Sequence, residues 1–88
     1  MMTTKISEII SKYRGDKSLR DFATDLSEKM PESISHQTIK NWEEGIKPQY
    51  YTILAIFITY DDWRGAFALE ILRVLKPELY KPDPIKSA

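Results

Sequence analysis

The sequence contains no cysteine, and it has one histidine and three glycines in 88 residues. Without cysteine, neither a disulfide nor a cysteine-ligated metal can stabilise the fold, and one histidine is too few for a histidine-based metal site. No cofactor is therefore expected. The longest hydrophobic run, Ile53–Ile58, is too short to span a bilayer, and the amino terminus lacks the apolar segment of a secretory signal. These absences predict a cytoplasmic protein without a membrane segment.

An excess of charge of one sign is also lacking, because thirteen basic and thirteen acidic residues cancel. Domains that bind nucleic acids usually carry a net positive charge, so the whole chain lacks that signature. The first twenty residues differ, because five of them are basic and two are acidic, a surplus of three. A DNA-binding face would need this surplus to converge with Lys40 and Lys47.

The side chains that enzymes use are sparse as well. There is no cysteine nucleophile and no glycine-rich phosphate loop, and the single histidine, His36, stands beside a helix cap. The acidic pairs Glu43–Glu44 and Asp61–Asp62 are adjacent in sequence, so their side chains diverge by about 100 degrees on a helix. We therefore expect neither an enzyme nor a small-molecule substrate.

Helical periodicity runs through a chain that is long enough for one small domain. A first helix is predicted over Thr4–Tyr13, and a second opens at Ser18 and ends before Pro31. Three further helices are predicted over 35–44, 49–58 and 62–76, the second of them with Ile53, Leu54, Phe57 and Ile58 in the core. The predicted fold is an all-α, compact five-helix bundle over residues 1–80, followed by a flexible tail at 81–88.

The stretch from Ile34 to Pro48 has the features of a short helix with an apolar back. Ser35 is an N-cap candidate, and Gly45 suits the left-handed position after the last turn. Three apolar residues of this stretch share one face: Ile39, Trp42 and Ile46. We expect Trp42 to pack inward, against Phe22, Ala23 and the apolar face of the helix predicted at 49–58.

The front of the same helix is polar and carries His36, Gln37, Lys40, Asn41 and Glu44. Glutamine and asparagine can each pair with adenine through two hydrogen bonds, and lysine can donate to guanine or phosphate. The front is thus suited to reading base edges. An ordinary amphipathic surface helix would have a polar front too, so the neighbouring sequence has to distinguish the two interpretations.

The segment Ser-His-Gln-Thr-Ile-Lys-Asn-Trp-Glu-Glu-Gly at 35–45 resembles the recognition helix of the lambda-repressor and Cro-like helix-turn-helix family. Upstream, Ser-Leu-Arg-Asp-Phe-Ala at 18–23 resembles the first helix of that motif, which would span 18–45. The matching positions are Phe22, Ala23, Ser35, Ile39, Trp42, Glu43 and Gly45. The spacing from Ala23 to Trp42 is six residues longer than in the family, which makes the usual tight turn an extended loop at 27–33.

The resemblance implies a small phage or bacterial transcriptional regulator, such as a repressor, that binds double-stranded DNA. By position it implies base contacts from His36, Gln37, Lys40 and Asn41, and DNA-backbone contacts from Ser35, Thr38, Lys47, Gln49, Tyr50 and Arg20. It also implies an ion pair between Glu43 and a basic residue of the first helix, either Lys12 or, with a shorter loop, Arg14. The alternative is a helical protein-interaction module, antitoxin-like or degenerate, that keeps this scaffold without binding DNA.

The last predicted helix is unusually apolar. One stripe contains Trp63, Ala66, Phe67, Ile71 and Val74, and a second contains Ala68, Leu69, Leu72, Leu75 and Leu79. Either the helix is the central core helix, or its second stripe binds a partner. Because one short reading helix offers few phosphate contacts, we predict a homodimer with twofold symmetry through residues 63–79.

Overall fold

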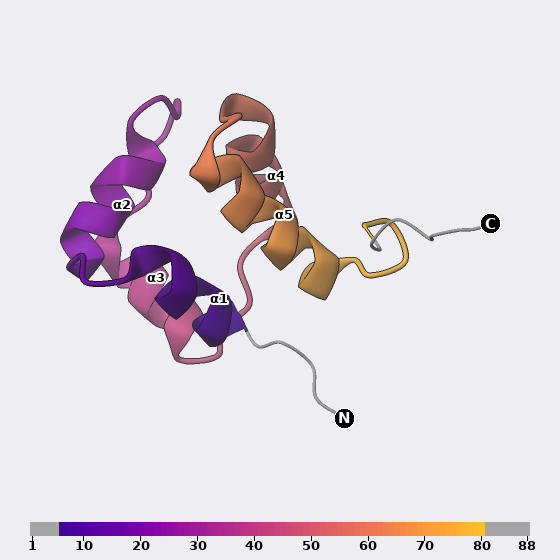
Figure 1. The fold of residues 1–88 in the computed structure, drawn as a ribbon, viewed down its shortest axis with the longest axis horizontal. Coiled ribbons are helices and arrows are strands. Elements are labelled where there is room, and N and C mark those ends of the chain that lie inside the picture. The colour runs from indigo at the N-terminus through magenta and orange to yellow at the C-terminus, as the bar shows by residue number, and fades with distance from the viewer. Residues whose placement is uncertain (1–5, 81–88) are drawn as a thin grey trace.

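The computed structural model describes residues 6–80 (Figure 1). Within them the chain forms five helices and no strand: α1 (Ile6–Arg14), α2 (Leu19–Ser27), α3 (His36–Glu43), α4 (Tyr50–Thr59) and α5 (Trp63–Leu75). The predicted all-α class and the number of helices are therefore confirmed. The predicted helix start at Thr4 and the predicted tail at 81–88 lie outside the described residues.

The helices are arranged as two pairs joined by the first helix. α2 packs against α3, α4 packs against α5, and α1 contacts both α3 and α5. Figure 1 shows the two pairs side by side, with α1 overlapping α3 in this view. Because α1 belongs to neither pair, it connects the half of the molecule that contains the predicted recognition helix to the other half.

Aromatic side chains fill the junction between the two halves. The Phe22 ring lies 5.8 Å from the Trp63 ring and 5.4 Å from the Phe67 ring, centroid to centroid. Tyr13 packs edge-on against Phe67 at 5.6 Å. Such pairs contribute beyond the apolar area that they bury. One cluster thus joins α1, α2 and α5.

Side-chain caps define the starts of three helices. Oxygen atoms of Ser18, Ser35 and Asp62 accept hydrogen bonds of 3.0, 3.1 and 3.0 Å from the backbone N–H groups of residues 21, 38 and 64. Each cap satisfies one of the amide groups that a helix start leaves unpaired. The predicted cap at Ser35 and the predicted helix start at Ser18 are confirmed.

The predicted end of the second helix is wrong, because α2 stops at Ser27 rather than continuing to Met30. The Ser27 hydroxyl accepts a 2.7 Å hydrogen bond from the Ile34 N–H and lies 3.2 Å from the Ile34 carbonyl oxygen. This side chain ties the two ends of the connecting segment together. The helix therefore ends three residues earlier than Pro31 predicts, and the connection to α3 starts at Glu28, in agreement with the extended loop predicted at 27–33.

The core-helix interpretation of α5 is confirmed, and the prediction of an uncovered second stripe is wrong. Ala68 and Leu72 of that stripe are completely buried within the chain, and Leu69 and Leu75 are half-buried; only Leu79, which follows the helix, is exposed. The reason is that α4 and α1 both pack on α5. A dimer interface through Ala68 and Leu72 is excluded in this fold.

Two further core predictions are wrong. In α4, Ile53 is fully buried as predicted and Leu54 is half-buried, whereas Phe57 and Ile58 are exposed. Their place in the core is taken by Ile56, which was not predicted and is fully buried. Because α4 is apolar on all sides, its sequence does not indicate which side faces inward. Ile46 is 58% exposed rather than buried behind α3, because Gly45 adopts a left-handed conformation, with φ +108°, and turns the chain away from the helix.

Candidate nucleic-acid interface

The predicted recognition helix, α3, is anchored through its apolar back. Ile39 is completely buried and Trp42 is 4% exposed, which confirms the inward packing of Trp42. At the start of α3 the Ser35 hydroxyl accepts from the Thr38 N–H and lies 3.0 Å from the Thr38 hydroxyl. The helix is therefore fixed at its first turn and along one side.

An ion pair braces α3 from α1. A guanidinium nitrogen of Arg14 lies 3.3 Å from a Glu43 carboxylate oxygen, and both side chains are largely covered. Lys12, the first candidate for this pair, instead contacts Glu70 of α5 at 2.9 Å, so that assignment is wrong and the alternative, Arg14, is correct. α1 extends one residue beyond its predicted end at Tyr13, which brings Arg14 to the α3 side.

The side of α3 that faces solvent carries amide and charged side chains. Gln37 and Lys40 are exposed, and Asn41 is half-buried. The Gln37 side-chain nitrogen donates a 3.1 Å hydrogen bond to the Asn41 side-chain oxygen one turn later. Lys40 lies 4.0 Å from Glu44, at the limit of an ion pair. Two amides that suit base edges thus form one continuous polar surface.

The remaining predicted contact residues lie on the two flanks of α3. On the α2 side, a shallow groove is lined by Arg20, Ser35 and His36, and His36 is half-buried there. On the α4 side, a larger groove of about 700 Å³ is lined by Thr38, Asn41, Lys47 and Gln49 together with apolar side chains such as Met30 and Trp42. The predicted base-contacting residues therefore do not all share one surface, because His36 faces away from Asn41.

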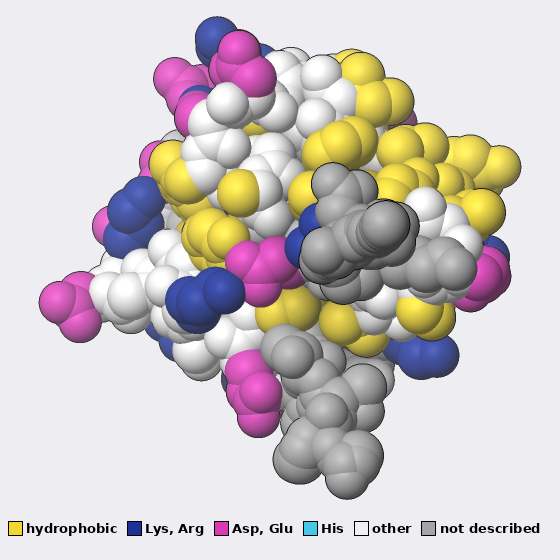
Figure 2. Space-filling view, turned by 45° about the vertical axis from the view of Figure 1, so that its right-hand side comes forward, with side chains coloured by type: hydrophobic (Ala, Val, Ile, Leu, Met, Phe, Trp, Pro, Cys, Tyr) yellow, Lys and Arg dark blue, Asp and Glu magenta, His cyan; other side chains and the backbone are white. Residues whose placement is uncertain are grey.

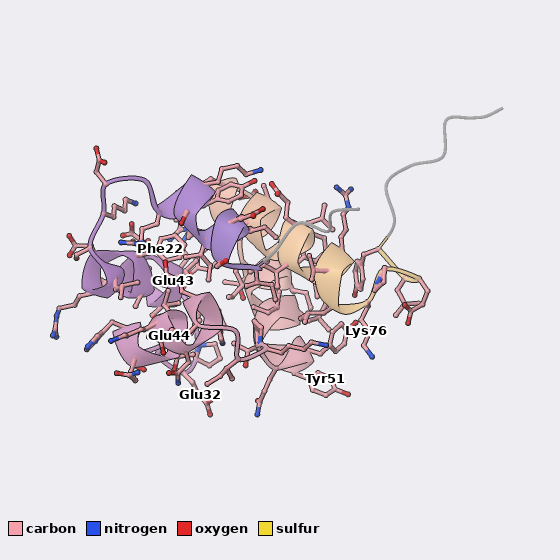
Figure 3. All side chains as sticks on the ribbon, turned by 90° about the horizontal axis from the view of Figure 1, so that it is seen from below. Phe22, Glu32, Glu43, Glu44, Tyr51 and Lys76 are labelled. Atoms are coloured by element: carbon pink, nitrogen blue, oxygen red, sulfur yellow. The ribbon has the colours of Figure 1, made fainter. Side chains whose placement is uncertain are left out.

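Acidic and aromatic side chains border the larger groove. Glu32 and Tyr51 line it, and Figure 3 shows both along the same edge of the molecule. Tyr50, predicted to contact the DNA backbone, has its hydroxyl 2.7 Å from the hydroxyl of Tyr80. That hydroxyl therefore already has a protein partner.

The basic surplus of the first twenty residues reaches α3 only in part. Within the described residues, Lys12 pairs with Glu70, Arg14 with Glu43 and Lys17 with Asp25. These pairs neutralise three of the five basic side chains through contacts within the fold. The cations that remain beside α3 are Arg20, Lys40 and Lys47, and Glu32 and Glu44 lie among the same surfaces.

Two residues that sequence reasoning missed hold the end of α2 beside the predicted motif. The Tyr60 hydroxyl bonds to backbone groups of the α2 end, and Arg64 donates to the Asp25 carbonyl oxygen at 2.8 Å and to the Glu28 carboxylate at 2.7 Å. The Arg64 guanidinium stacks 3.9 Å from the centre of the Tyr60 ring. No local pattern could have revealed them, because their partners lie more than thirty residues earlier.

Arg64 also controls the ionisation of its neighbour Asp62. Its hydrogen bonds to the carboxylate lower the pKa of Asp62 to about 2, and burial opposes this shift only in part. The same contacts raise the pKa of Arg64. The pair therefore stays ionised at neutral pH, and the carboxylate remains a cap for α5.

Within residues 6–80, no group of three or more histidine, aspartate or glutamate side chains is placed to hold a metal ion. No helix in the same part of the chain is long and apolar enough to cross a membrane. Comparisons with protein-family models, with curated proteins and with solved structures give no match.

Proposed function

We propose that this chain is a lambda-repressor-like helix-turn-helix regulator that binds double-stranded DNA with α3 in the major groove. One observation carries the proposal: Gln37 and Asn41 face outward one turn apart on a helix whose back is buried. Their mutual hydrogen bond leaves one N–H and the carbonyl oxygen of Gln37 available. These are the donor and acceptor that the N7 and N6 positions of adenine require.

The contacts that hold α3 in place agree with this function. A reading helix has to be rigid, because a base contact is lost when the side chain is displaced. The buried Trp42, the serine cap and the Arg14–Glu43 pair restrain α3 from three directions.

Phosphate contacts would come from the flanks of the reading surface. Arg20 lies on one flank of α3 and Lys47 on the other, with Lys40 between them. Ser35, Thr38 and Gln49 offer neutral hydrogen-bonding groups near the starts of α3 and α4. With three cations, the logarithm of the binding constant should fall with the logarithm of salt concentration with a slope of about −3 per bound copy.

Selection of binding sequences from a random pool of DNA duplexes tests the proposal. On the selected duplex, Gln37→Ala and Asn41→Ala should each cost about 1–3 kcal/mol in binding and broaden the sequence preference. Lys40→Ala should weaken binding to all sequences more evenly and reduce the salt slope by about 1. The matched control is Lys76→Ala, because Figure 3 shows Lys76 far from Glu44 of the α3 end; it should leave both quantities unchanged.

The proposal fails if the pool yields no enriched sequence at low salt. It also fails in its base-reading part if both amide variants keep the wild-type preference, because Gln37 and Asn41 would then not touch base edges.

A second candidate function is favoured by the charge distribution. Three basic side chains near the amino terminus are paired within the fold, and the larger groove beside α3 is partly apolar. Both features suit a helical protein-interaction module. This candidate predicts no salt-dependent DNA binding, so the same selection experiment separates the two.

A further inference from the structure

α4 is apolar on every side, yet the chain covers only its inner side. Tyr51, Leu54, Ala55 and Ile58 recur at i, i+3, i+4 and i+7 and form the outward side, named here the α4 face. Tyr51 is 78% and Ile58 71% exposed, and the other two are half-buried. Five large hydrophobic side chains are exposed within residues 6–80, and three of them belong to α4.

Exposed apolar surface is therefore concentrated on α4. Figure 2 shows hydrophobic side chains gathered over one side of the molecule, whereas charged side chains dominate the opposite edge. A patch of this kind on a small protein marks a surface that binds another molecule. A soluble helix that is apolar all round is normally covered all round.

We propose that the α4 face packs against the α4 face of a second copy of this chain, with the two helices antiparallel about a twofold axis between Leu54 and Ala55. Such an interface is made from one surface used twice. In this register Tyr51 lies opposite the partner's Ile58, and Leu54 lies opposite the partner's Ala55. A large side chain thus meets a smaller one at the axis, which allows close packing.

The distribution of charge along and beside α4 favours a second copy of this chain as the molecule that covers the α4 face. A twofold axis places identical residues near each other, so a charged residue in the middle of the face would oppose pairing. None of the ten residues of α4 is charged. At the two ends the charges are opposite: Lys47 precedes the helix, and Asp61 follows it. Antiparallel pairing brings Lys47 beside the partner's Asp61 at both ends of the interface.

The expected affinity follows from the size of the surface. A helix of ten residues is about 15 Å long, so the interface lies at the small end of those that form stable complexes. Self-association should therefore occur in the micromolar range rather than the nanomolar range. This dimer does not require DNA, and it does not use the buried Ala68 and Leu72.

Sedimentation velocity from low micromolar to millimolar protein tests the proposal. The wild type should shift from monomer to dimer, and Ile58→Glu should remain a monomer with an unchanged melting temperature. The matched control is Ser11→Glu, which adds the same charge at an exposed position of α1; it should dimerise like the wild type. A wild type that stays monomeric at millimolar concentration, or an Ile58→Glu variant that dimerises normally, overturns the proposal.

Charge reversal tests the antiparallel register. Lys47→Glu and Asp61→Lys should each weaken the dimer, and the two together should restore it. Because the chain has no native cysteine, oxidation of Ala55→Cys should give a disulfide-linked dimer, whereas oxidation of Ser11→Cys should not. A double charge reversal that fails to restore the dimer, or equal cross-linking at both positions, overturns the register.

Discussion

The hydroxyl group of Tyr60 donates a 2.9 Å hydrogen bond to the carbonyl oxygen of Leu26, thirty-four positions earlier in the chain. The same hydroxyl accepts a 2.8 Å hydrogen bond from the Lys29 N–H. Both backbone groups lie at the end of α2, where a helix leaves groups without internal partners. One phenol therefore joins the predicted DNA-binding motif to the turn between α4 and α5.

Replacing Tyr60 by phenylalanine should lower the free energy of unfolding by about 1–3 kcal/mol, because two backbone groups at the α2 end lose their partner. Urea denaturation of dilute protein measures the change. Tyr51→Phe is the matched control, since the Tyr51 side chain is exposed, and it should change stability little. Equal midpoints for the two variants would show that the Tyr60 hydroxyl does not hold the α2 end.

Gly65→Ala should destabilise the fold, although alanine is normally the better helix former. A β-carbon at Gly65 would come well within 3.0 Å of the Tyr60 carbonyl oxygen, a backbone atom that cannot move freely. We expect a loss of about 1–3 kcal/mol, as for other overpacked sites. Gly15→Ala is the comparison, because it has no neighbour within 4 Å and only a left-handed conformation to accommodate. Thermal unfolding that shows a more stable Gly65→Ala variant contradicts this packing.

Trp42→Ala should lower the free energy of unfolding by about 3–5 kcal/mol, a large share of what a small domain possesses. The reason is the cavity that an almost fully buried indole leaves behind α3. Ile46→Ala, at an exposed position three residues after α3, serves as the control and should have little effect. A Trp42→Ala variant that melts like the wild type would place the indole outside the core.

Arg14 and Glu43 should be energetically coupled. In a double-mutant cycle with Arg14→Met and Glu43→Gln, we expect a coupling of about 0.5–1 kcal/mol, because the pair is largely covered but keeps some contact with solvent. Lys12→Met combined with Glu43→Gln is the matched control, because Lys12 contacts Glu70 instead. Coupling in the control cycle, or its absence in the first, would reverse the assignment of the partner.

Acid should release the Asp62 cap. The pKa of Asp62 in the fold is about 2, below the ordinary value of 3.8, because Arg64 donates hydrogen bonds to the carboxylate. The folded state thus favours the ionised form, and this contribution to stability is present above pH 3.8 and is lost as pH falls toward 2. Titration of the carboxyl carbon by NMR should show the low pKa, and Arg64→Met should raise it. A pKa of 3.8 in the wild type would contradict the contact.

The sequence indicated the helices because their signals are local. Caps at Ser18 and Ser35 and the left-handed glycine at Gly45 depend on neighbours within a few residues, so they could be read directly. The inward position of Trp42 followed from the same spacing. The start, the end and the buried side of α3 could therefore be predicted from the sequence.

Features that depend on distant partners could not be predicted in this way. The inner side of α4 is one such feature, because an apolar surface all round a helix gives no preferred direction. The burial of Ala68 and Leu72 is another, since it depends on two helices packing on α5 together. Tyr60 and Arg64 form hydrogen bonds with backbone groups of α2 that lie more than thirty residues earlier in the chain. The residues next to them in the sequence give no indication of these contacts.

The contact between α1 and α5 determines the order in which a growing chain can fold. The Tyr13 hydroxyl lies 2.5 Å from a carboxylate oxygen of Glu70, fifty-seven positions later. A short connection joins α4 to α5, and the longer loop at 28–35 joins α2 to α3, but both are far shorter than the segment between α1 and α5. The entropy cost of closing a loop increases with its length. Each pair can therefore form during synthesis, and α1 can already pack on α3, but the contact of α1 with α5 has to wait until α5 has been made. A product truncated before Trp63 would leave α1 without its contact with α5, and proteases should degrade it rapidly.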